Sequence, residues 1–158
     1  MQAQSEIPIS TQTKTVTIRL KPGEDLKESL DSFVRLHHIS AACIVTCAGS
    51  LQQAVIRYAN QPNADTLTGH FEIVSLTGTL SISGSHLHIS ISDSTGKTIG
   101  GHLKEGSKVY TTAEIVLAIF PDIAYTREID ATFGYKELVA KKVKTVGERG
   151  KRKKNGKQ

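Results

Sequence analysis

The chain has 158 residues, and its formal net charge is +5 at pH 7 with neutral histidines. This length suits one domain with a hydrophobic core, and the scarcity of aromatic residues leaves Val, Ile, Leu and Ala to build it. No apolar run has the length of a membrane span, and residues 1–10 lack the pattern of a secretory signal. These features exclude a membrane-spanning class and predict a soluble intracellular protein, in the nucleus or the cytoplasm.

Apolar periodicity divides the chain into one helix and many strands. Residues 24–38 place Leu, Phe and Val at helical spacing after two acidic residues, which is typical of an amphipathic helix. Strands are predicted over residues 13–20, 41–48, 51–59, 70–82, 108–120 and 124–129, with a hairpin over residues 85–103. We expect a turn at Gly49 and Ser50, and a closing turn or short helical segment over residues 132–140. One helix with many strands predicts an α+β fold with a mainly antiparallel sheet.

The predicted hairpin carries the residues with the most chemical content. His86 and His88 are two residues apart on a strand, so both imidazoles point to one face. Leu87, Ile89 and Ile91 alternate with them and point to the other face. His102 lies on the second strand of the same hairpin.

Whether His102 joins the other two histidines depends on the turn between the strands. If Gly96 closes a three-residue loop from the left-handed region, His88 lies directly opposite His102 on the same face. The alternative loop count would pair His102 with Leu87 and send it to the other face. The two glycines just before His102 permit a further bulge, which could preserve or spoil the pairing.

Three imidazoles on one face are a typical ligand set for a divalent transition metal. Zinc held by three histidines keeps a fourth position open for water or a substrate oxygen, so zinc is the first metal to consider. Other transition metals accept the same ligands, and the sequence does not choose among them. The alternative is that His86, His88 and His102 are polar residues on the solvent face of a two-stranded ribbon.

Cys43 and Cys47 lie in an apolar segment, where reduced and buried thiols are the ordinary interpretation. Their four-residue spacing would put both on one face of a strand, within reach of a metal. No second ligand pair lies nearby to complete such a set.

The positive charge is concentrated at one end of the chain. Residues 141–158 hold nine basic side chains and one acid, whereas residues 1–140 hold eleven basic and fourteen acidic side chains. We predict a disordered basic tail over 141–158, because this segment lacks the apolar pattern that would offset its ordering entropy. Its densest run, Lys151, Arg152, Lys153 and Lys154, could be a nuclear-import signal or could contact DNA phosphates without sequence preference. The alternative is that the tail only adds solubility.

Seven ordered motifs support a resemblance to a known family. They are residues 19–26 (RLKPGEDL), 48–51 (AGSL), 69–78 (GHFEIVSLTG), 86–88 (HLH), 100–103 (GGHL), 109–114 (VYTTAE) and 134–138 (GYKEL). Together they resemble the plant-and-prokaryote-conserved (PPC) domain, which also occurs in plant AT-hook nuclear-localised proteins. The resemblance covers about residues 14–140, which we take as the domain, preceded by a flexible segment over residues 1–13. It implies an α+β domain that assembles as a homotrimer.

For the plant members, the resemblance implies DNA and protein partners. Those proteins bind AT-rich DNA through an Arg-Gly-Arg-Pro core outside the domain, which residues 148–153 (ERGKRK) lack. They also contact transcription factors through a Gly-Arg-Phe-Glu-Ile-Leu motif. Residues 69–74 (GHFEIV) correspond to that motif, and His70 replaces its arginine, which removes a permanent cation.

For the stand-alone prokaryotic members, the resemblance implies a metal. They share the His-x-His and Gly-Gly-His elements, and their fold is similar to that of acetolactate decarboxylase, a zinc enzyme with three histidine ligands. This implies metal roles for His86, His88 and His102. The decarboxylase also uses carboxylates and an arginine, for which Glu72, Glu114 and Arg57 are catalytic candidates by residue type alone. Glu114 stands between apolar residues in a predicted buried strand, where a carboxylate would need a partner.

Three functional interpretations follow. The first is a trimeric binding module associated with DNA or chromatin through the basic tail, which is what the family resemblance most often implies. The second is a metal-dependent enzyme that acts on a small oxo-acid or a related metabolite. The third is a scaffold in which the metal has a structural role only.

Overall fold

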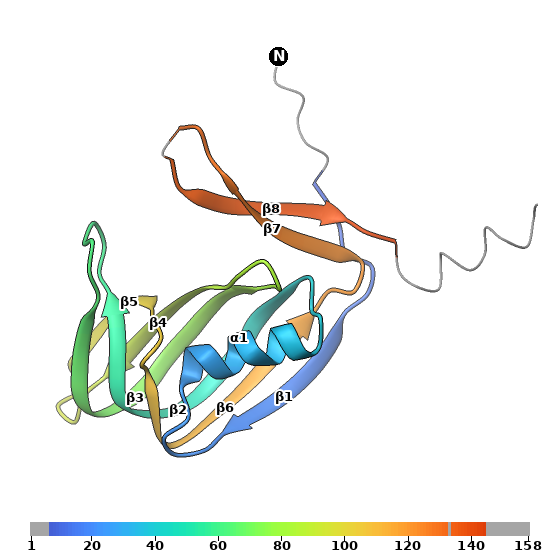
Figure 1. Cartoon of the computed structure of the whole chain (residues 1–158). Coiled ribbons are helices and arrows are strands. Elements are labelled where there is room, and N and C mark those ends of the chain that lie inside the picture. The colour runs from blue at the N-terminus through green and yellow to red at the C-terminus, as the bar shows by residue number, and fades with distance from the viewer. Residues whose placement is uncertain (1–6, 133, 145–158) are drawn as a thin grey trace, which may run out of the picture.

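The computed structural model describes residues 7–132 and 134–144. The elements, in chain order, are β1 (Lys14–Leu20), α1 (Leu26–Leu36), β2 (Ala42–Arg57), β3 (Asp65–Leu80), β4 (His86–Ser92), β5 (Thr98–Leu103), β6 (Lys108–Ile119), β7 (Ile123–Ile129) and β8 (Lys136–Lys142) (Figure 1). Six strands form one sheet in the order β1-β6-β2-β3-β4-β5, and β7 pairs with β8 in a separate ribbon. All the strand pairs are antiparallel, which confirms the predicted α+β class. In these described ranges, no helix is both long and apolar enough to cross a membrane.

The sheet partly closes on itself around β2. This strand has 16 residues and several register shifts, and its last two residues also pair with β5, Ile56 with Leu103 and Arg57 with His102. Bulges of this kind bend a strand and increase its twist. The group β2-β3-β4-β5 is therefore a small closed cycle that fixes β5 beside the end of β2.

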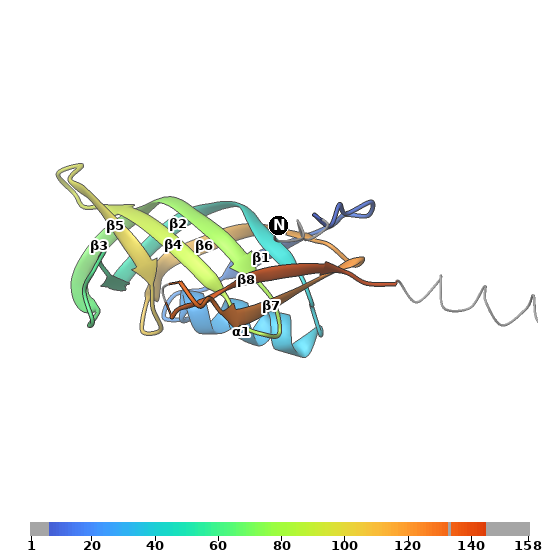
Figure 2. The same ribbon diagram turned by 90° about the horizontal axis from the view of Figure 1, so that it is seen from above.

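Helix α1 covers one face of the sheet (Figures 1 and 2). Its N-cap is Asp25, whose side chain accepts a hydrogen bond from the Glu28 amide at 3.0 Å. Leu26, Leu30 and Val34 form its buried stripe. The stripe packs into a core of aliphatic side chains drawn from the strands, including Leu51, Ile56, Leu80, Leu87, Ile91, Leu103, Val109, Ile115 and Leu117.

The β7–β8 ribbon is joined to the rest of the molecule through Asp122. The Asp122 carboxylate accepts hydrogen bonds from the Ser10 hydroxyl (2.6 Å), the Thr11 amide (2.8 Å) and Lys142 Nζ (2.8 Å). It is 2 % exposed, and its pKa is held well below the usual range, mainly by the bond from Lys142 and next by that from Ser10. One buried carboxylate therefore links the segment before β1, the start of β7 and the end of β8.

Two local predictions are wrong. The expected turn at Gly49 and Ser50 does not form, because both residues lie inside β2, where a register shift between Gly49 and Leu51 takes up the irregularity. Residues 136–142 form strand β8, although a closing turn or helical segment was expected there. Pairing with β7 decides this conformation, since the segment itself contains Glu, Leu, Ala and Lys, which favour helices.

The two cysteines do not share a face. A register shift between Ile44 and Thr46 separates them, so Cys43 pairs with Ala118 and Cys47 with Ile115, three residues apart on β6. Cys47 is buried, and burial raises the pKa of its thiol to about 11. These thiols therefore do not form a joint metal site.

Candidate metal centre

Strand β4 places His86 and His88 on the outer face of the sheet. Leu87 lies between the two histidines and is 1 % exposed, and Ile89 follows His88 and is 3 % exposed. Both side chains point into the core. The period of two therefore fixes the direction of both imidazoles, because turning them inward would bring the aliphatic side chains to the surface.

The turn after β4 brings His102 to the same place. Gly96 has a φ of +80°, and its amide donates to the Asp93 carbonyl at 2.9 Å, while the Asp93 amide donates to the Lys97 carbonyl at 3.0 Å. This loop sets His88 directly opposite His102 in the β4–β5 ladder. The predicted register is confirmed, and the glycines before His102 do not disturb it.

His86, His88 and His102 form a compact group, called the histidine cluster below. Each residue offers one ligand nitrogen, and these atoms all lie within 4.8 Å of one another. The ring centroid of His86 lies 5.0 Å from those of both His88 and His102. Nε2 of His86 and Nε2 of His88 are 3.1 Å apart. Three nitrogens that converge in this way are a suitable donor set for one metal ion.

Burial and positive neighbours keep two of these rings neutral. The pKa of His102 is lowered to about 4, mainly because burial disfavours the imidazolium and next because His86 and Lys104 repel a positive charge. The pKa of His86 is also lowered, by burial first and by Arg127 second. Neutral imidazoles at pH 7 keep the lone pairs that a metal requires.

One buried nitrogen of the cluster has no hydrogen-bond partner in the described part of the chain. Nδ1 of His102 is enclosed and unbonded. A buried polar atom without a partner costs about 1–3 kcal/mol, and such atoms are rare in folded proteins. Coordination through this nitrogen would compensate the cost, and the convergence of the three ligand atoms within 4.8 Å fits a metal.

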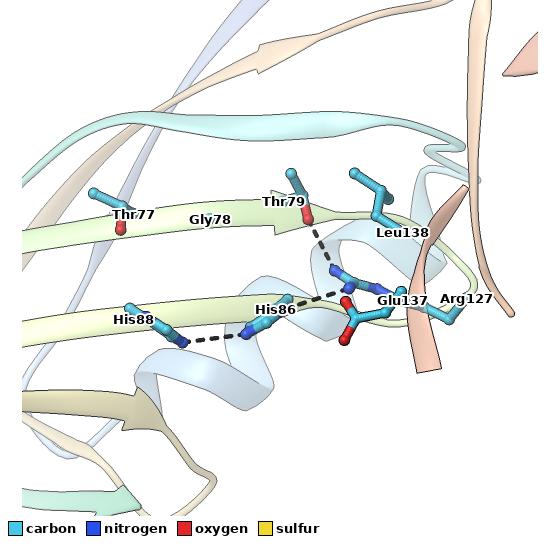
Figure 3. A pocket seen from close by; sticks show the side chains of 8 residues that line it. All are labelled: Thr77, Gly78, Thr79, His86, His88, Arg127, Glu137 and Leu138. Carbon is cyan, nitrogen blue, oxygen red and sulfur yellow. Dashed lines mark hydrogen bonds between the residues drawn. The ribbon is translucent and has the colours of Figure 1, made fainter. Parts of the chain in front are cut away.

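A pocket of about 300 Å³, called the ligand pocket below, opens beside the cluster (Figure 3). It is lined by Thr77, Gly78, Thr79, His86, His88, Arg127, Glu137 and Leu138. Strands far apart in the sequence build it, because Thr77 and Thr79 lie opposite His88 and His86 on β3, while Arg127 belongs to β7. Arg127 Nη2 donates to Thr79 Oγ1 at 3.0 Å, and Nη1 donates to Nδ1 of His86 at 3.4 Å.

The three catalytic candidates are placed differently. Arg57 is the strand neighbour of His102, and its charge helps to lower the pKa of His102. Glu72 is exposed on the same face, but it lies opposite Ser92. Since Ser92 is four strand residues from His88, this is a separation of roughly 13 Å. Glu114 is exposed on β6, opposite Arg19, whereas a buried setting was expected from its apolar neighbours.

Sequence patterns did not identify Arg127, Glu137 or the threonines of β3 as neighbours of the histidines. The histidines lie on one hairpin, whereas Arg127 and Glu137 reach them only through the placement of the β7–β8 ribbon. One signal for the threonines was available in the sequence: Thr77 and Thr79 are two residues apart, so both side chains lie on the same face of a strand. The predicted nucleic-acid residues Lys151, Arg152, Lys153 and Lys154 lie outside the described residues.

Comparison with known proteins places these features in a family. The model of the Plants and Prokaryotes Conserved domain matches residues 8–121. Two bifunctional GlmU proteins from Synechococcus strains are 42 % and 43 % identical over 79 % and 80 % of this chain. The chain spans only about a fifth of their length, since the match covers 20 % of each.

Two solved structures share the fold over most of their length. A hypothetical protein from Salmonella cholerae-suis is 39 % identical, with a TM-score of 0.83 over 85 % of this chain and 97 % of its own. A metal-containing protein from Archaeoglobus fulgidus is 26 % identical, with a TM-score of 0.74 over 85 % of this chain and 99 % of its own.

Proposed function

Because the chain belongs to the Plants and Prokaryotes Conserved domain family and carries a convergent histidine cluster, we propose that it binds one divalent transition metal through His86, His88 and His102. The observation that carries the proposal is the convergence of the three nitrogens within 4.8 Å. The unbonded Nδ1 of His102 and the metal-containing relative from Archaeoglobus fulgidus support it. Zinc is the proposed metal, since three imidazoles and one open position suit its tetrahedral geometry.

The open pocket favours a reactive or ligand-binding metal over a structural one. Structural zinc sites are closed by four protein ligands, whereas three histidines leave a position free. Here His86 and His88 line the ligand pocket together with Thr79 and Arg127. A metal bound there would act as a Lewis acid or would lower the pKa of a coordinated water.

Metal analysis of the untagged protein tests this function. We expect about one transition metal ion per chain after dialysis, and loss of most of it in His86→Ala and His88→Ala, because two imidazoles hold a metal far less tightly than three. His70→Ala is the matched control: His70 is exposed on β3 and stacks on Tyr110, at a ring-centroid distance of 4.0 Å. The control should retain the metal. Wild-type protein that binds no metal, even after incubation with zinc, would contradict the proposal.

A catalytic role is the second candidate, and the ligand pocket favours it. In that role the chain is a metal-dependent enzyme acting on a small oxo-acid or a related metabolite, with a fold like that of acetolactate decarboxylase. Of the acids and bases considered, only Arg57 lies near the histidine cluster, so Glu72 and Glu114 are poor choices for a proton-transfer residue.

We also propose that the protein works as a homotrimer and associates with DNA through its basic tail. Val45 and Val74 are 57 % and 56 % exposed, and burial of such side chains between copies of the chain would favour self-association. Lys141 and Lys142 belong to β8 and form ion pairs there, but residues 143–158 still hold seven basic side chains, and this concentration of positive charge supports phosphate contact. In this combination the domain would be the assembling part, and the tail would be the part that meets nucleic acid.

A further inference from the structure

We propose that the ligand pocket binds a small anion, a carboxylate or a phosphate, through Arg127, and that metal ligation by His86 releases Arg127 for this role. The inference rests on the proposed metal site. It goes beyond that site by naming the class of ligand and the side chain that receives it.

The hydrogen bonds around His86 determine where its proton lies. Arg127 has no acceptor atom, so Nδ1 of His86 must accept the 3.4 Å bond from Nη1. A neutral His86 then carries its proton on Nε2, which lies 3.1 Å from Nε2 of His88. Arg127 therefore donates a hydrogen bond to His86, and His86 in turn donates one to His88.

Metal ligation requires the opposite arrangement. Nε2 is the nitrogen of His86 that faces His88, so it is the atom that would serve as ligand, and it must then present a lone pair. The proton of the neutral ring moves to Nδ1. Two N–H groups, from His86 and Arg127, would then face each other across 3.4 Å, and the guanidinium would have to turn away.

Glu137 supplies the replacement partner for His86. It lines the same pocket as His86 and Arg127. Figure 3 shows its carboxylate beside Arg127 and His86. Histidine ligands of metals commonly donate their second N–H to a carboxylate, which orients the ring. Glu137 would thus hold the ring while Arg127 becomes available.

The surroundings of the released Arg127 suit a small anion. A guanidinium fork binds carboxylate and phosphate groups with two parallel hydrogen bonds. The hydroxyl of Thr79, which now accepts from Arg127, would be free to donate to the same anion. Leu138 adds an apolar wall, and a volume of about 300 Å³ lies at the small end of the range for ligand pockets.

Anion titration with and without metal tests the proposal. Propionate and inorganic phosphate are titrated separately into the full-length protein, zinc-loaded and metal-stripped, after the zinc content has been measured. In the zinc-loaded protein, Arg127→Gln should weaken binding on the order of tenfold, the value of a charge-assisted pair. In the stripped protein the same substitution should weaken binding less, because the Arg127 fork is engaged with His86 and Thr79 and only its charge then acts on the anion.

Two further variants control for charge and folding. Arg19→Gln is the matched control, because Arg19 also donates to a threonine on a neighbouring strand, Thr112 at 3.1 Å, and lies far from the cluster. It should leave both affinities unchanged. Arg127→Lys keeps the charge without the fork and should restore only part of the binding.

Imidazole nitrogen NMR gives a second readout that does not depend on anion affinity. We expect His86 to carry its proton on Nε2 in the stripped protein and on Nδ1 in the zinc-loaded protein. An unchanged tautomer, binding of neither anion, or an equal effect of Arg127→Gln in both forms would overturn the proposal. Failure of the metal site itself is distinguishable, since the zinc content then stays near zero before any anion is added.

Discussion

Gly78 controls the backbone on which the histidine cluster is built. Its φ is +140°, and a Cβ atom at this position would lie 1.9 Å from the carbonyl oxygen of His86. Gly78→Ala should therefore push β4 outward at His86. We expect a loss of about 2–4 kcal/mol in unfolding free energy and a lower zinc content per chain. Urea unfolding and metal analysis of the same preparation measure both effects.

Gly84→Ala distinguishes the effect of the steric clash at Gly78 from the effect of placing alanine at a positive φ. Gly84 also has a positive φ, +118°, but no atom lies within 4 Å of the point that a Cβ atom would occupy there. This variant should lose only about 1 kcal/mol and should keep its metal. If the two variants lost equal stability and both retained zinc, the contact between Gly78 and His86 would not matter for the site.

At the scale of residues, local rules predicted the histidines but not their surroundings. Alternation along β4 and the turn at Gly96 were sufficient to place His88 opposite His102, because both rules act within one hairpin. Arg127 could not be found in this way, because its contact with His86 depends on the placement of a ribbon formed much later in the chain. The exposure of Glu114 was also missed, because β6 was interpreted as a strand buried on both faces; Ala113 and Ile115 are buried, and alternation sends Glu114 between them to the exposed face.

At the scale of elements, the sequence predicted the helix and most strands, and it failed where pairing overrides local preference. Gly49 and Ser50 suggested a turn, but both neighbours of β2 hold them in a continuous strand. The last strand, β8, contains helix-favouring residues and becomes extended because β7 offers a partner. The bulge in β2 that separates Cys43 from Cys47 likewise leaves no pattern in the sequence.

The link made by Asp122 should control how firmly the β7–β8 ribbon is held. Asp122→Asn removes the charge that Lys142 contacts at 2.8 Å, so we expect a lower melting temperature at neutral pH and faster amide exchange in β7 and β8. Since the pKa of Asp122 is depressed on folding, its contribution is complete above the ordinary aspartate pKa of about 4 and is lost as the pH falls below it. The gap between wild type and variant should therefore narrow in acid.

Asp65→Asn is the control for the change in net charge, because Asp65 stands exposed at the start of β3. It should leave the melting temperature and the exchange in β7 and β8 close to those of the wild type. A stability gap for Asp122→Asn that stays constant from pH 7 to pH 3 would show that the ionised carboxylate is not the source of the effect.

At the scale of the whole molecule, assembly and DNA contact should be separable. Lys141 and Lys142 form ion pairs with Glu128 and Asp122 in the β7–β8 ribbon, so a chain ending at Lys144 keeps the described fold. Both this chain and the full-length protein should have the mass of three copies by light scattering. Only the full-length protein should bind duplex DNA, with an affinity that falls steeply as salt is added.

Equal DNA binding by the two chains would show that the domain, and not the basic tail, contacts the nucleic acid. A monomeric mass for both chains at micromolar concentration would contradict the homotrimer. A trimer that forms only with the tail present would contradict the separation of the two roles.

The position of all three histidines on one hairpin also bears on the order of folding. The residues from His86 to His102 form a short, local unit, whereas the ligand pocket also needs β3, β7 and β8. Hairpins form in microseconds, and contacts between distant segments form more slowly. We therefore expect the metal ligands to need only this local pairing to meet, whereas Arg127 and Glu137 join them only when the distant β7–β8 ribbon packs beside β3 and β4.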